Sequence, residues 1–196
     1  MKIALMEVRG RPTLGLAYPE SPDRYLDLCN LQESVPTDMV ALLRLGGDVM
    51  ERIRRIGSTA LVDGSVWQPL ADAHLLPVVS RPGKVVCVGL NYADHAKEGG
   101  NARPEYPSFF LRGASSLIAH GDALVCPKVS DKLDYEAELA VVIGQRVRHA
   151  SLERALAAVA GYAASTTARC ATINARLRSG RSGRTSTAQV LSVSGS

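Results

Sequence analysis

The sequence lacks the cysteine patterns that mark disulfide frameworks and zinc sites. Its four cysteines, Cys29, Cys87, Cys126 and Cys170, lie far apart, and none belongs to a C-x-x-C pair. No run of about eighteen apolar residues is present, so no membrane-spanning helix is predicted. The start of the chain, MKIALMEVRG, reaches a glutamate and an arginine too soon to form the apolar region of a signal peptide. We therefore expect a cytoplasmic protein with reduced thiols and no membrane partner.

Acidic and aromatic residues are missing from the end of the chain. After Ala163 the sequence contains five arginines and no acid, and Ser, Thr, Ala and Gly make up most of the rest. These arginines exceed the net charge of +4, so the remainder of the chain carries no net positive charge. A basic segment without interleaved aromatic residues is a poor match to a nucleic-acid-binding surface. We predict that residues 164–196 form a disordered tail and that no nucleic acid is bound.

The rest of the chain has an ordinary globular composition, with 46% hydrophobic and 21% charged residues. Residues 1–75 predict short strands, with a hairpin that turns at Gly10 and a helix that Thr37 caps and Gly46-Gly47 divides. Residues 76–163 contain several strand patterns and, from Ser151 to Tyr162, the pattern of an amphipathic helix. We expect an α+β fold that is mostly β, with a small N-terminal domain at 1–75 and a partial catalytic domain at 76–163.

Two glutamates stand at the entrance to a strand in the segment LDYEAELAVVIG. The run from Leu139 onward is apolar and β-branched, and it predicts a buried strand that ends at Gly144. Glu136 and Glu138 are two residues apart, so their carboxylates point to the same face of this strand. A hard divalent cation with oxygen ligands would hold the two like charges together. A hydrated strand edge, where each glutamate meets water or an arginine, is the alternative.

A second group of polar residues follows a predicted buried strand, in VGLNYADHAKE. If the segment after Tyr92 is helical, His95 and Glu98 are three residues apart and lie side by side. A carboxylate beside an imidazole orients the ring and raises its basicity, as a general base requires. A surface histidine in a helical salt bridge is the alternative. Arg112, in FFLRGASSL, is a candidate for binding a carboxylate. A solvated charge at the end of a strand is the alternative for this arginine.

Three segments in this order, RPGKVVCVGLNYADHAKE, PSFFLRGASSLIAHGDAL and SDKLDYEAELAVVIG, resemble the fumarylacetoacetate hydrolase family. The resemblance covers residues 76–162, and the part before it is a looser match. It implies a catalytic domain of the mixed β-roll type with a Mg²⁺ or Mn²⁺ site. Members of the family hydrolyse, decarboxylate or tautomerise β-diketo and oxo acids, and they are typically dimers.

The resemblance also implies a role for each candidate residue. Glu136 and Glu138 are the expected metal ligands. His95 with Glu98 is the expected base pair, carried on a mobile lid. Tyr92 and Arg112 are the expected contacts to a small oxo-acid substrate.

The resemblance stops after Ala163. The next segment of the family is similar to F-N-D-G-S-V-R-D-Y-Q, whose aspartate would be the third metal carboxylate, and Thr167 occupies its position here. If the codons for residues 164–170 are read in the frame that starts at the third base of each codon, they can encode that family segment. We therefore expect the tail to be a frameshifted reading of a family gene, which leaves the catalytic domain truncated. Genomic DNA should show an insertion or deletion near codons 163 and 164 relative to close homologues, and an uninterrupted alignment there would contradict the hypothesis.

Two functions remain open from the sequence. The first is a metal-dependent hydrolase, lyase or tautomerase for β-diketo or oxo acids, weak or inactive in the truncated chain. The second is a non-catalytic remnant that contacts other proteins through exposed strand edges. Turnover of oxaloacetate or an acylpyruvate with Mg²⁺ favours the first, and a defined oligomer without metal binding favours the second.

Overall fold

The computed structural model describes most of the chain. It covers residues 1–30, 35–62, 66–100, 102, 104–126, 128, 131–170, 185–187 and 190–193. For His95, Arg169, Cys170 and the strands after residue 184, it describes the backbone and not the side chains. No helix within these ranges is long and apolar enough to cross a membrane.

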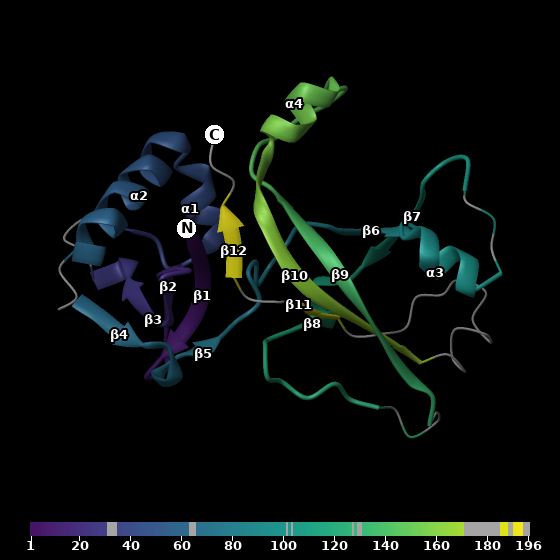
Figure 1. Cartoon of the computed structure of the whole chain (residues 1–196), viewed down its shortest axis with the longest axis horizontal. Helices are drawn as coiled ribbons and strands as arrows, with labels where there is room; N and C mark the ends of the chain where they lie inside the picture. Colours follow the sequence, from purple (N-terminus) through teal and green to yellow (C-terminus); the bar gives the residue numbers. More distant parts are fainter. Residues whose placement is uncertain are drawn as a thin grey trace.

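The first part of the chain forms an antiparallel sheet with two helices packed against it (Figure 1). Its hairpin turns at Arg9 and Gly10, whose φ angles of 51° and 76° lie in the left-handed region that a tight hairpin turn needs. The 3-10 helices in this part are η1 (Leu28–Asn30) and η3 (Leu70–Asp72). The strands are β1 (Lys2–Val8), β2 (Arg11–Tyr18), β3 (Ser21–Asp27), β4 (Trp67–Pro69) and β5 (His74–Leu75).

Two helices, α1 (Met39–Arg44) and α2 (Gly47–Val62), occupy the region predicted to hold one divided helix. The division at Gly46 is confirmed, because this residue has a φ of 86° between the two helices. The predicted cap at Thr37 is wrong by one residue. The carboxylate of Asp38 accepts the hydrogen bond from the backbone N–H of Ala41 at 2.8 Å.

The hydrophobic core lies in this first part. Side chains from β1 and β2 pack there against Met39, Leu42 and Ile53 of the helices. Among the described residues, the largest fully buried side chains all fall within the first 78 positions: Tyr25, Ile3, Met6, Leu14, Leu16, Leu28, Met39, Leu42, Ile53 and Val78. The first part of the chain therefore supplies most of the core, which Ala163 of the second part completes and which burial of apolar surface stabilises.

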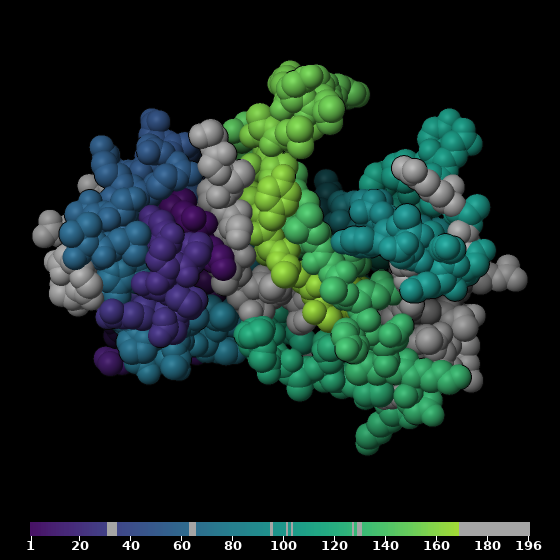
Figure 2. Space-filling model, viewed as in Figure 1, coloured from purple at the N-terminus to yellow at the C-terminus, as the bar shows by residue number. Residues whose placement is uncertain are grey.

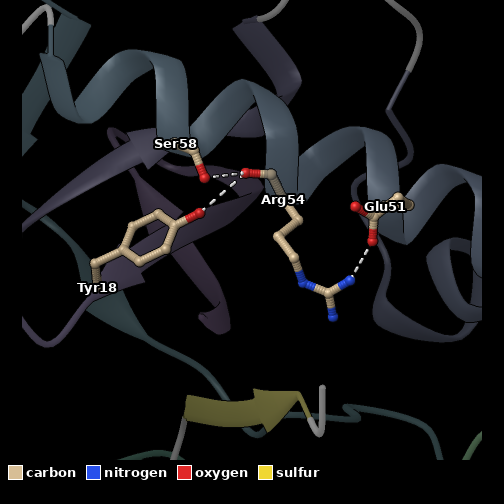
Figure 3. A network of polar contacts seen from close by, with 4 residues as sticks. All are labelled: Tyr18, Glu51, Arg54 and Ser58. Carbon is tan, nitrogen blue, oxygen red and sulfur yellow. Dashed lines mark hydrogen bonds and ion pairs between the residues drawn. The ribbon is translucent and has the colours of Figure 1, made fainter. Parts of the chain in front are cut away.

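A polar network fixes α2 to the edge of this core (Figure 3). The hydroxyl of Tyr18, on β2, donates to the backbone carbonyl of Arg54 at 3.2 Å. The Ser58 hydroxyl donates to the same carbonyl at 3.0 Å, and the Arg54 guanidinium forms an ion pair with Glu51. The hydroxyl of the half-buried Tyr18 thus has a hydrogen-bond partner, and this bond connects the sheet to the middle of the helix.

The second part of the chain is built around a long antiparallel hairpin, which crosses the centre of Figure 1. Its strands are β9 (Leu133–Ile143) and β10 (Val159–Cys170), with α4 (Leu152–Ala157) between them. A separate two-stranded sheet and its following helix consist of β6 (Val85–Gly89), β7 (Ser108–Arg112) and α3 (Ala93–Glu98). The shorter elements are η4 (Ala114–Ser116), β8 (Leu117–Ile118), β11 (Thr185–Thr187) and β12 (Val190–Val193).

One strand joins the two parts of the molecule. β12 pairs with β1 on one side and with β10 on the other, both antiparallel. Within the described residues the main sheet therefore runs in the order β4-β3-β2-β1-β12-β10-β11-β8, with β9 on the outside of β10. The predicted α+β fold with mostly strand is confirmed.

The structure differs from the sequence prediction in the helix before β10 and in the strand at Leu139. The helix predicted for residues 151–162 ends at Ala157, because the chain from Val159 onward pairs with β9. Pairing between strands overrides the local helical pattern there. The strand predicted to be buried from Leu139 onward has one open face, since Leu139 is 61% exposed and Ile143 is 57% exposed.

The structure also differs from the predicted tail. Residues 164–170 belong to β10, and residues 185–187 and 190–193 form β11 and β12. Strand pairing uses the backbone N–H and C=O groups that every residue except proline carries, and threonine is common in strands. The low apolar content that suggested disorder therefore does not prevent these pairings. The predicted disorder of residues 171–184, 188–189 and 194–196 lies outside the described residues.

A methyl group added at Gly57 should destabilise the N-terminal domain. A Cβ there would come within 2.5 Å of both Leu16 Cδ2 and Tyr18 Oη, and Leu16 has no exposed surface into which it can move. Gly57→Ala should lower the free energy of unfolding by about 1–2 kcal/mol, because an overpacking cost of about 1–3 kcal/mol exceeds the helix-propensity gain of about 1 kcal/mol.

Urea titration followed by circular dichroism measures this change. Gly47→Ala is the matched control, because it lies in the same helix with no atom within 4 Å of the added Cβ. It should leave stability unchanged or raise it slightly. Equal effects of the two substitutions would contradict the close packing at Gly57.

Candidate functional site

The two predicted metal ligands lie on one face of β9. Alternate residues of the strand are half-buried, and Glu136 and Glu138 belong to this set together with Ala140 and Val142. Ala140 and Val142 pack against the core cluster of the N-terminal domain. One face of β9 therefore contacts the core at Ala140 and Val142, and the preceding residues of that face, Glu136 and Glu138, carry carboxylates. This confirms the shared direction that the spacing of the glutamates predicts.

The pairing of β9 with β10 places hydroxyl groups opposite these carboxylates. Thr167 is the cross-strand partner of Glu136, and Ser165 is the partner of Glu138. Directly opposed residues share a face of the sheet, so two carboxylates and two hydroxyls line this part of the hairpin. Within the described ranges, no group of three or more His, Cys, Asp and Glu residues is placed to hold a metal ion. The candidate oxygen ligands on this face are therefore the carboxylates of Glu136 and Glu138 and the hydroxyls of Thr167 and Ser165.

These oxygen atoms fit a hard divalent cation. Carboxylate and hydroxyl oxygens are the ligand types that Mg²⁺ and Mn²⁺ prefer. The Oε1 atom of Glu136 is shielded from solvent, which limits the competition of bulk water at that atom.

A thiol connects the β6–β7 sheet to the carboxylate face. Cys87 lies on β6, and Arg112 lies at the end of β7 on the same face of their sheet. Burial raises the pKa of the Cys87 thiol, the charge of Arg112 and a hydrogen bond with it lower the pKa, and the charge of Glu138 raises it. The thiol is therefore hydrogen-bonded to Arg112, experiences the charge of Glu138, and is protonated at neutral pH.

The segment predicted to be a lid contacts β9 directly. The hydroxyl of Tyr92 accepts a hydrogen bond from the backbone N–H of Leu139 at 3.2 Å. In the space-filling view, the green hairpin and the teal segment that contains α3 lie against each other below an open notch (Figure 2). Leu90, just before Tyr92, has a φ of 52°, a conformation that costs a leucine about 1 kcal/mol and redirects the chain after β6.

The structure joins some of the predicted site residues to neighbouring elements. Tyr92 contacts the backbone of Leu139, the residue after Glu138, and Arg112 is hydrogen-bonded to Cys87. The predicted helix is confirmed, because His95 and Glu98 both belong to α3, where Glu98 is exposed. The side chain of His95 lies outside the described part of the structure, so its pairing with Glu98 stays a prediction.

Sequence reasoning missed two residues of this site, Cys87 and Ser165. Cys87 is one of four scattered cysteines, and only the pairing of β6 with β7 places it beside Arg112. Ser165 falls in the segment predicted to be disordered, and only the register of β10 places it opposite Glu138. The two-residue period of a strand predicts which residues share a face with Cys87, but not which side chains of other elements lie against that face.

Known proteins are similar to this chain in sequence. The sequence model described as fumarylacetoacetate (FAA) hydrolase C-terminal matches residues 84–189, more than half of the chain. A mitochondrial oxaloacetate tautomerase of Bos taurus is 37% identical over 137 residues, which are 70% of this chain and 42% of the relative. The chain therefore spans less than half the length of this curated relative.

Solved structures with a similar fold include enzymes that act on small oxo acids. Maleylpyruvate hydrolase from Sphingobium sp. SYK-6 superposes with a TM-score of 0.74 at 25% identity, over 99% of this chain and 68% of that one. A second crystal structure of that enzyme, in complex with a manganese(II) ion and pyruvate, superposes with a TM-score of 0.74 at 24% identity, over 99% and 67%. Because the family model matches more than half of the chain, the chain belongs to the fumarylacetoacetate hydrolase family.

Proposed function

We propose that the chain carries a divalent-cation site for small oxo acids and belongs to a metal-dependent hydrolase, lyase or tautomerase. The observation that carries this proposal is the placement of Glu136 and Glu138, half-buried on one strand face and opposite the hydroxyl-bearing residues Thr167 and Ser165. The names of the relatives support it, since one is an oxaloacetate tautomerase and another is a maleylpyruvate hydrolase solved with manganese and pyruvate.

Glu136 and Glu138 would hold the cation, with Mg²⁺ and Mn²⁺ as the candidates that oxygen ligands favour. When bound, the cation supplies Lewis-acid polarisation of a carbonyl oxygen. Arg112 is the proposed partner of the carboxylate of the oxo acid, because a guanidinium binds a carboxylate through two parallel hydrogen bonds. The phenol of Tyr92, which accepts from Leu139, still has its own proton to donate to a substrate oxygen.

His95 is the proposed base, and Glu98 is the residue that orients it. An unperturbed imidazole has a pKa of about 6.5, so it can accept a proton near neutral pH. With oxaloacetate the imidazole would move the proton between carbon and oxygen that separates the keto and enol forms. With a substrate that is cleaved, it would take a proton from the attacking water.

The environment and assembly of the protein are also proposals. We propose a cytoplasmic location, and the mitochondrial tautomerase marks the second compartment to test. We propose a homodimer, as in typical members of the family.

A second function is favoured by the exposed apolar face of the β6–β7 sheet. Val86 is opposite Leu111 and Val88 is opposite Phe109, and these four side chains are 40–63% exposed. Such a face suits contact with another polypeptide. A defined oligomer that binds no metal and turns over no oxo acid would favour this non-catalytic function.

Metal binding should depend on Glu136. Isothermal titration calorimetry with Mn²⁺ should detect weak binding, with a Kd of about 1 mM, as expected for a site with few charged ligands. Glu136→Gln should abolish this heat, because it removes one of two carboxylates. Thr167→Asp should tighten binding by about 10-fold or more, because it adds a carboxylate directly opposite Glu136.

Glu153→Gln is the matched control for the metal titration. Glu153 is an exposed carboxylate on α4, on the loop side of the hairpin, and its loss should leave the heat unchanged. Tight binding that survives Glu136→Gln would overturn the assignment of the ligands.

Proton transfer should depend on His95 in a chain whose reading frame is restored after codon 163. His95→Ala should lower kcat for oxaloacetate tautomerisation by about 10²- to 10⁴-fold, the usual contribution of a general acid or base. Glu98→Gln should lower kcat less, because it orients the ring and transfers no proton. Both effects are measured from the absorbance of the enol.

Asp94→Asn, on the same helix, is the control and should leave kcat nearly unchanged. Neither His95→Ala nor Glu98→Gln should weaken Mn²⁺ binding, because the metal carboxylates lie on β9. In the chain as it stands, both substitutions should be nearly silent. Full kcat without His95 in the restored chain would show that this histidine is a surface residue.

A further inference from the structure

The strongest contact between the α3 segment and β9 is made by one phenol. The backbone N–H of Leu139 donates to the hydroxyl of Tyr92 at 3.2 Å, between residues that are 47 positions apart. A backbone N–H has a single proton, so this amide is directed to the phenol and not to β10. β9 pairs with β10 along one edge, and Tyr92 therefore binds the edge that the described strands leave open.

Tyr92 also lies immediately before α3. Its backbone carbonyl accepts the hydrogen bond from the N–H of Ala96 at 3.0 Å, which closes the first turn of the helix. One residue thus holds the helix through its carbonyl and the strand through its hydroxyl. These two hydrogen bonds of Tyr92 fix the position of α3 relative to Leu139.

Most of the described side chains of α3 are exposed. Among its described side chains only Ala96 is buried, with 2% of its surface exposed, while Asp94, Lys97 and Glu98 are exposed. The chain turns through left-handed conformations on both sides of the helix, at Leu90 with a φ of 52° and at Gly100 with a φ of 67°. A short helix between two such turns has little packing of its own to define where it lies.

We propose that Tyr92 is a positioning residue, which sets the distance from His95 and Glu98 on α3 to the carboxylates on β9. This role rests on the proposed function, because it assigns Tyr92 to the placement of the base relative to the metal ligands. The hydroxyl acts as an acceptor toward Leu139, so its proton is directed away from the strand. A substrate contact by the same hydroxyl is therefore compatible with the anchor.

The anchor is tested by hydrogen exchange of the ¹⁵N-labelled full-length chain. The amide of Leu139 should be protected in the unsubstituted protein. Tyr92→Phe keeps the ring and removes the hydroxyl, so it should accelerate exchange at Leu139 by about 5- to 10-fold, the effect of losing one hydrogen bond. Tyr135→Phe is the control, because Tyr135 is an exposed tyrosine on the same strand, and it should change nothing at Leu139.

An unprotected Leu139 amide in the unsubstituted protein would overturn the proposal, and this measurement needs no variant to fold. Equal exchange in the unsubstituted protein and in Tyr92→Phe would overturn it as well.

The positioning role is tested by the effect of Tyr92→Phe on kinetics with oxaloacetate and Mn²⁺ in the chain whose reading frame is restored after codon 163. kcat should fall by about 5- to 10-fold while the Kd for Mn²⁺ stays unchanged, because the substitution displaces the base and leaves the metal ligands in place. An unchanged kcat in an active protein would contradict positioning. If the frame-restored protein shows no turnover, the proposed function fails, and the exchange of Leu139 in the chain as it stands still decides whether Tyr92 anchors α3.

Discussion

The register between β9 and β10 is the constraint on which the rest of this structure depends. Each residue from Leu133 to Ile143 has a defined partner on β10 apart from one irregularity near Gly161, and a shift by one residue would turn every side chain to the other face. In the observed register Ala140 faces Ala163 within the core, while Glu136 and Glu138 face the hydroxyls of Thr167 and Ser165. The packing of small apolar residues at one end of the hairpin thereby determines which face presents the carboxylates.

The two parts of the molecule differ in how they are stabilised. The N-terminal domain buries large side chains from both strands and helices, and polar contacts such as that of Tyr18 are satisfied inside it. The second part relies on strand pairing, and its apolar side chains on β6, β7 and β9 remain largely exposed. Backbone hydrogen bonds fix geometry but contribute only modest net free energy, whereas buried apolar area is the dominant favourable contribution to folding. The site is therefore carried by the less densely packed part of the chain.

Electrostatics at the site follow from this arrangement. Two carboxylates two residues apart on one strand repel each other, and the guanidinium of Arg112 is brought near by the β6–β7 sheet. Cys87 reports this environment, since its pKa responds to burial, to Arg112 and to Glu138 together. The thiol, the guanidinium and the carboxylate come from three strands, so the local field is a property of the fold and not of any one motif.

The sequence by itself determined the family, the mostly β fold, the short helix after Tyr92 and the common direction of Glu136 and Glu138. These follow from motifs and from periodicities of two and 3.6 residues, which are local properties of the chain. Only the tertiary structure decided that β10 continues past Ala163, that Thr167 and Ser165 stand opposite the glutamates, that Cys87 lies beside Arg112, and that the phenol of Tyr92 binds Leu139. The physical reason is that cross-strand register and contacts between distant segments depend on how whole faces pack, and no local pattern specifies which backbone group will meet which side chain.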